Sequence, residues 1–163
     1  MEHGDFIKET NRILGKYNKM KVAVQNLTEE IEARTAALQG ESVAIARYGY
    51  EPTGGTAELT ATEAAAEKRR KTESDIKTMK ERKAEMERMI RAVDRALECL
   101  SSADERLIRK RYIDGLAWWQ VARESGYTEK WAKERGGKVL QDVALMLFGV
   151  IERPAQLKIK FEN

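Results

Sequence analysis

The segment from residue 100 to residue 143 limits the possible folds most strongly, because it is patterned as three short helices separated by glycine-containing turns. Ser101 or Ser102 can cap the first helix, since a serine side chain accepts a hydrogen bond from the free N–H groups at a helix start. Gly115 and Gly126 follow the first and second helical stretches, and glycine adopts the positive φ of a helix end without steric cost. Three helices joined by such short turns predict a helix-turn-helix unit.

The apolar positions of this segment support the same interpretation. Thr128 can cap the third helix, and the first helix carries acidic residues in its first turn, where the helix dipole favours negative charge. With a period of 3.6 residues, one face of each helix becomes apolar. The inward positions are then Leu107, Ile108, Tyr112, Leu116, Val121, Ala122, Ala132, Val139, Leu140 and Val143.

The run from Ser101 to Leu140 resembles region 4 of bacterial sigma factors, and within that class it is most similar to the RinA/ArpU-type regulators of phages and prophages. The residues that carry the resemblance are Tyr112-Ile113-Asp114-Gly115-Leu116, Trp118, Val121-Ala122, Gly126-Tyr127-Thr128-Glu129 and Gly137-Lys138-x-Leu140. The resemblance implies a sequence-specific regulator that binds double-stranded DNA and activates late phage genes, with bacterial RNA polymerase as a candidate partner.

The segment departs from that pattern at three positions. Ala117 stands where a capping Ser or Thr is usual, and Arg135 stands where an apolar residue usually packs. Gly136 adds a second glycine, beside Gly137, to the third helix, at a cost of about 0.5–1 kcal/mol per interior glycine. Two explanations stay open: a close approach of the backbone to DNA or to another helix, or a local kink or break.

The outward side of the third helix carries the candidate DNA contacts. In a helix-turn-helix, the N-terminal residues of the recognition helix do most of the base reading. Lysines there can donate to guanine or to phosphate, and glutamates can accept from cytosine N4. The sigma-region-4 resemblance implies that Glu129, Lys130, Lys133 and Glu134 contact a promoter. The predicted contacts are Thr128, Glu129, Lys130, Lys133, Glu134 and Lys138.

Arg109 and Arg111, on the helix before the turn, are candidates for phosphate contacts that add affinity without sequence information. Arg111 can instead form an ion pair with Asp114 or Glu124. Trp131 can stack on a sugar, but packing against the preceding helix is the favoured prediction.

Two heptad repeats precede this segment. From Phe6 to Leu38 the apolar residues recur in steps of three and four, and a second, weaker repeat runs from about residue 61 to 100. Gly40 is predicted to end the first helix, and the glycines and proline between residues 40 and 60 predict a loop. The expected organisation is an all-α chain, with a helix over 1–39, a loop over 40–60, a helix over 61–100, a helix-turn-helix domain over 101–149 and a tail over 150–163.

The two long helices can fold back as an antiparallel hairpin or pair with another subunit. Because a two-helix hairpin buries little apolar surface by itself, we expect a homo-oligomer, either a dimer or a larger assembly. The predicted oligomerisation residues are Ile13, Tyr17, Met20, Val24, Leu27, Ile31, Met86, Ile90, Val93 and Leu97.

Composition narrows the function classes. Charged residues make up 35% of the 163 residues, and the net charge of +3 permits nucleic-acid binding without arguing for it alone. The single cysteine excludes an internal disulfide and a cysteine-cluster zinc site. No nucleotide-binding loop, metal-ligand cluster or nucleophile constellation is present, so neither an enzyme nor a cofactor is expected. The sequence has no membrane-spanning or signal-peptide pattern, and the cytoplasm of a bacterial host is the expected location.

Two other functions remain compatible with the sequence. A small terminase subunit also joins a helix-turn-helix to helical oligomerisation elements, and it recognises a DNA packaging site. A coiled-coil interaction protein would instead use its terminal unit to bind RNA polymerase or another regulator.

Overall fold

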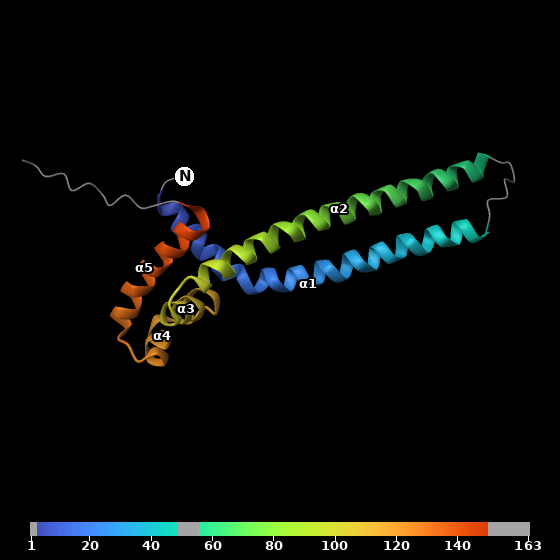
Figure 1. Ribbon diagram of the computed structural model, residues 1–163. Helices are drawn as coiled ribbons and strands as arrows, with labels where there is room; N and C mark the ends of the chain where they lie inside the picture. The colour runs from blue at the N-terminus through green and yellow to red at the C-terminus, as the bar shows by residue number, and fades with distance from the viewer. Residues whose placement is uncertain (1–2, 49–55, 150–163) are drawn as a thin grey trace, which may run out of the picture. The chain divides into compact units, whose positions relative to one another are not determined.

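The computed structural model describes the backbone of residues 3–48 and 56–149 and the side chains of residues 6–40 and 62–149. Every regular element in these ranges is helical, which confirms the predicted all-α fold. The elements are α1 (His3–Tyr48), α2 (Thr56–Glu98), α3 (Ser102–Ile108), the π-helix η1 (Arg109–Ile113), α4 (Trp118–Ser125) and α5 (Glu129–Phe148), as shown in Figure 1. The predicted tail over 150–163 lies outside the described residues.

The chain divides into two compact units. One unit, the hairpin unit, is formed by residues 19–90. The other, the head unit, combines residues up to 18 with residues from 91 onward. The head unit is therefore larger than the predicted 101–149 domain, because it includes the start of α1 and the end of α2.

In the hairpin unit, α1 and α2 run side by side in opposite directions (Figure 1). Ile31 and Ile76 are buried, with 8% and 7% of their surfaces exposed. A guanidinium nitrogen of Arg34 lies 3.5 Å from the carboxylate of Asp75 on the facing helix. The two heptad seams thus face each other in the single chain.

The prediction that Gly40 ends the first helix was wrong. Helix α1 continues through Gly40 to Tyr48, and α2 begins at Thr56 rather than near residue 61, so the predicted 40–60 loop is too long at both ends. Gly40 is not among the glycines with positive φ in the described chain. Propensity disfavours an interior glycine by only about 1 kcal/mol, which a long helix tolerates.

We expect Gly40→Ala to stabilise the protein by about 0.5–1 kcal/mol, since a Cβ there would meet nothing within 4 Å and alanine loses less entropy in a helix. Thermal or urea unfolding measures the change. If the helix instead ended at Gly40, with this residue in the left-handed region, alanine would be strained there and the substitution would destabilise the protein. A destabilised variant would therefore contradict the continuous helix.

The head unit has buried apolar side chains from α1, α2, α3, α4 and α5. The first turns of α1 supply Thr10, a buried residue whose hydroxyl donates to the carbonyl oxygen of Phe6 at 2.8 Å. The rings of Phe6 and Phe148 lie 5.3 Å apart, which joins the start of α1 to the end of α5. The side chains that are almost completely buried are Leu14, Val93, Leu97, Ile108, Val121, Val139 and Val143.

Several residues that were predicted to mediate oligomerisation are buried within the chain itself. Ile13, Tyr17, Val93 and Leu97 are buried in the head unit, and Ile31 is buried in the hairpin unit, so none of the five forms an open seam. The Tyr17 hydroxyl also donates a hydrogen bond to the Asp94 carboxylate within the head unit. The heptad pattern cannot distinguish a partner helix from the same chain and one from another subunit. The other five predicted residues, Met20, Val24, Leu27, Met86 and Ile90, are half-buried.

Candidate nucleic-acid interface

The first helix of the head begins at the predicted cap. The Ser101 side chain accepts a hydrogen bond from the Asp104 N–H at 3.2 Å, and its hydroxyl donates to the Asp104 carboxylate at 2.9 Å. After Ile108 the helix widens into η1, where the N–H of Asp114 donates to the carbonyl oxygen of Arg109 at 2.9 Å. This π-helix was not predicted, because its residues have the pattern of an ordinary α-helix.

The turns on both sides of α4 use the predicted glycines. Gly115 has φ of +77° and Gly126 has φ of +72°, so both occupy the left-handed region. Ala117 offers no side-chain cap to α4, but its own N–H donates to the side-chain oxygen of Gln120 at 2.8 Å. Half of a capping box thus remains although the usual Ser or Thr is missing.

Helix α5 begins as predicted after a three-residue turn. The Thr128 side chain accepts a hydrogen bond from the Trp131 N–H at 3.2 Å and so caps the helix. The four predicted inward residues, Ala132, Val139, Leu140 and Val143, are all buried, and so are Gly136 and Ala144. The opposite face of α5 is therefore free to meet a ligand.

The predicted contact residues on α5 are all exposed, but they are not equivalent. Glu129 and Lys133 form an ion pair with a distance of 2.8 Å along the helix. None of the ion pairs found among the described residues includes Lys130, Glu134 or Lys138. By the helical period, these three residues also lie furthest from the buried face. They form the outward stripe of α5.

The two arginines predicted to touch phosphate both have partners within the head. Arg109 is half-buried and pairs with Glu105 at 2.8 Å, and this hydrogen bond raises the pKa of Arg109 above its ordinary value. Arg111 donates to the carbonyl oxygen of Leu116 at 2.9 Å and lies over the Trp118 ring. The predicted ion pair of Arg111 with Asp114 or Glu124 does not form; Lys110 pairs with Glu124 instead.

Trp118 explains the unusual Gly136. The indole lies against the α5 backbone at Gly136, where an added Cβ would come within 2.3 Å of Trp118 Cη2 and 2.9 Å of Leu107 Cδ2. Trp118 also packs against Tyr112 in a T-shaped arrangement, with ring centroids 6.0 Å apart. Gly136 thus permits the close approach of another helix, one of the two explanations left open, whereas the space around Gly137 is empty within 4 Å.

Arg135, the second departure from the pattern, ties α5 to α3. Its guanidinium donates two hydrogen bonds to the Asp104 carboxylate, at 2.7 and 2.5 Å. Asp104 is 7% exposed, and the hydrogen bond from Arg135 lowers the pKa of this carboxyl below its ordinary value of 3.8. An apolar contact is thus replaced by a bidentate ion pair that fixes the direction of α5.

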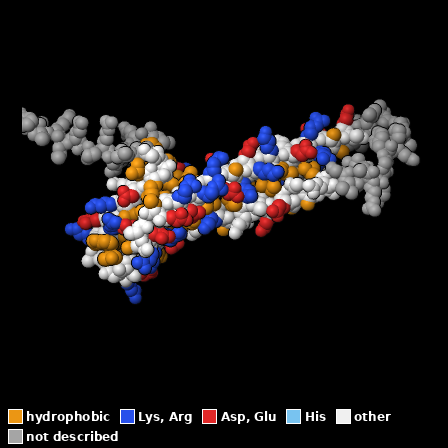
Figure 2. All heavy atoms as spheres, in the orientation of Figure 1, with side chains coloured by type: hydrophobic (Ala, Val, Ile, Leu, Met, Phe, Trp, Pro, Cys, Tyr) orange, Lys and Arg blue, Asp and Glu red, His pale blue; other side chains and the backbone are white. Residues whose placement is uncertain are grey.

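Two exposed aromatic residues next to the outward stripe form a stack that was not predicted from the sequence. Trp131 stacks on Tyr127 with ring centroids 3.9 Å apart and an angle of 26° between the planes. Both rings remain accessible, at 38% and 49% exposure. Trp131 also lines a shallow depression with Glu134, Arg135 and Lys138. In Figure 2 hydrophobic surface lies among charged side chains at the N-terminal end of α5.

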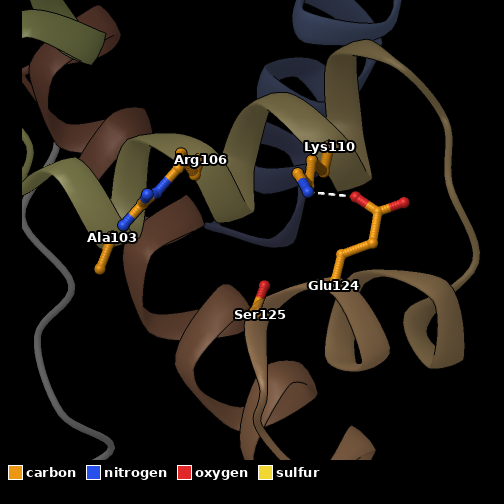
Figure 3. Close-up of a pocket in the computed structure, with 5 residues that line it drawn as sticks. All are labelled: Ala103, Arg106, Lys110, Glu124 and Ser125. Atoms are coloured by element: carbon orange, nitrogen blue, oxygen red, sulfur yellow. Dashed lines mark hydrogen bonds and ion pairs between the residues drawn. The ribbon is translucent and has the colours of Figure 1, made fainter.

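A second depression lies between α3 and the end of α4. Figure 3 shows the Lys110 amine directed at the Glu124 carboxylate, whereas Arg106 extends along α3 past Ala103. Because Glu124 neutralises Lys110 there, this depression carries less positive charge than its lysine and arginine suggest. The Lys110–Glu124 pair instead connects η1 to α4.

Comparison of the chain with protein-family models, with curated proteins and with solved structures finds no match. In the helices that the structure describes, no stretch is long and apolar enough to cross a lipid bilayer. Among the described side chains, no three of the His, Cys, Asp or Glu type come together as a metal site. The geometry of the head unit is therefore the basis for a functional proposal.

Proposed function

We propose that this protein is a sequence-specific double-stranded DNA-binding regulator of transcription, with α5 as its recognition helix. The observation that carries the proposal is the pair α4 and α5, joined by a three-residue turn around a left-handed Gly126, with an exposed charged face at the start of α5. A helix of this diameter and polarity suits the major groove of B-DNA. The resemblance to RinA/ArpU-type regulators adds activation of late phage genes as the proposed setting.

The outward stripe supplies groups for both kinds of DNA contact. Lys130, the second residue of α5, is placed to donate to guanine or to a nearby phosphate, and Glu134 is placed to accept from cytosine N4. Lys138, two turns further on, suits a phosphate contact that adds affinity without specificity. Two joined heads would bind more tightly than one, because linkage raises the effective concentration of the second head. Self-association is therefore part of the proposal.

We expect Lys130→Ala to weaken binding to a selected DNA site by about tenfold or more, since a good base contact contributes about 1–3 kcal/mol. Lys138→Ala should weaken specific and unspecific DNA alike and reduce the salt dependence of binding by about one released counterion. Titration of labelled duplexes at several salt concentrations measures both effects.

Lys77→Ala, an exposed lysine of α2 in the hairpin unit, serves as the matched control and should change affinity less than about twofold. Equal affinity of the wild type and the Lys130 variant for the selected site would contradict the recognition role of α5. Light scattering on the same samples gives the subunit number, and a ring of about eight or more subunits would favour DNA packaging over regulation.

A further inference from the structure

The exposed Tyr127–Trp131 stack is not used by the charged contacts described above. Trp131 is 38% exposed and Tyr127 is 49% exposed, and leaving such large aromatic rings in water costs free energy. The two rings are stacked, and 38% of the Trp131 surface remains exposed to a ligand. The stack also limits the rotamers of the indole, which lowers the entropy cost of using it in a contact.

The position of Trp131 decides what that ligand is. It is the third residue of α5 and shares one depression with Glu134 and Lys138 of the outward stripe. In a helix-turn-helix, the N-terminal residues of the recognition helix contact base edges. The C5-methyl group of thymine is the apolar group that base pairs present in the major groove.

Phosphate is a poorer match for this side chain. An indole has a single N–H donor and no charge, whereas Lys130 and Lys138 are nearby and carry the charge that phosphates attract. We propose that Trp131, held in place by Tyr127, recognises the methyl group of a thymine in the major groove and so makes this base a required position of the DNA site. This inference rests on the proposed function and names the base that the site must contain.

The test compares thymine with deoxyuridine, which differs only by the missing methyl group. A duplex site is first selected with the full-length protein from random double-stranded DNA, and each thymine is then replaced in turn. We expect one replacement to weaken binding about three- to fivefold, the loss typical of one buried methyl group. In Trp131→Ala the same replacement should have no effect, because the partner of the methyl group is gone.

Trp119→Ala is the matched control, because Trp119 is an exposed tryptophan of α4 and should keep the full response to deoxyuridine. Trp131→Phe provides a second variant, which retains an apolar ring and should retain part of the response. Circular dichroism and the unfolding midpoint show whether each variant folds.

The outcomes separate this inference from the proposed function. If a duplex site is enriched but every deoxyuridine replacement is neutral, or if Trp131→Ala keeps the wild-type response, the role of Trp131 is wrong and DNA recognition by α5 stands. If no duplex DNA is enriched, both proposals fail together.

Discussion

Gly136→Ala is expected to destabilise the protein by about 1–3 kcal/mol, although alanine is the better helix former. The new Cβ would lie 2.3 Å from the Trp118 ring and 2.9 Å from Leu107, so the indole would have to move off α5. The ring cannot move alone, because Tyr112 and Arg111 pack on it as well. Urea unfolding of the variant measures the loss.

Gly137→Ala is the matched control for this experiment. Its Cβ would meet nothing within 4 Å, so the same change one residue later should stabilise the protein by about 0.5–1 kcal/mol. Trp118→Phe removes the ring atoms nearest to Gly136, and in that background Gly136→Ala should lose much of its cost. Equal effects of the two glycine substitutions would contradict the close packing of Trp118 on α5.

Asp104→Asn is expected to cost about 1–2 kcal/mol at neutral pH. The variant keeps the shape of the side chain but replaces two charge-assisted hydrogen bonds from Arg135 by weaker ones. This cost is at the lower end of the range for a charged hydrogen-bonded pair, because 44% of the Arg135 side chain is exposed and water screens its charge. Loss of this tie should also weaken DNA binding, since Arg135 holds α5 in its direction.

The pH dependence of this pair has a definite sign. The pKa of Asp104 is lowered in the folded protein, chiefly by the hydrogen bond from Arg135. Its stabilisation is therefore complete above the ordinary pKa of 3.8 and is lost as the pH falls through the lower folded value. The stability difference between wild type and Asp104→Asn should shrink below about pH 4 and stay constant above about pH 5.

Glu105→Gln tests whether the effect is specific to the buried carboxylate. Glu105 adjoins Asp104 but pairs with Arg109, the first residue of η1, and their side chains are 33% and 41% exposed. Such a pair contributes about 0.3–0.5 kcal/mol. If the two substitutions cost the same, the Asp104–Arg135 pair does not hold α5 in place.

The positions at which helices begin and end in the head were predicted well. Ser101 and Thr128 cap helices, and Gly115 and Gly126 take positive φ, as their local chemistry requires. Caps and left-handed glycines depend on hydrogen bonds and sterics within a few residues, so they can be read without knowledge of the fold. Gly40 shows the limit, because a glycine marks a helix end only when its backbone turns.

Side-chain partners were predicted less well, because they come from distant parts of the chain. Arg111 donates to the carbonyl oxygen of Leu116, and Arg135 pairs with Asp104 of α3; neither partner was predicted from the sequence. Leu14, which is completely buried, lies outside the heptad seam because the start of α1 is enclosed by the head unit. A heptad repeat marks only one face of a helix, so it does not reveal residues such as Leu14 that are buried on another face of α1.

The sequence alone determined that the chain is all-α, where the three short helices of the head begin and end, and which face of α5 is apolar. Only the tertiary structure showed which side chains of the two heptad seams are buried, that Gly136 makes room for Trp118, and which residues of α5 form its exposed outward stripe. The physical reason is the range of the interactions. Periodicity and capping act over one or two helical turns, whereas packing and ion pairing depend on which residues the completed fold brings together.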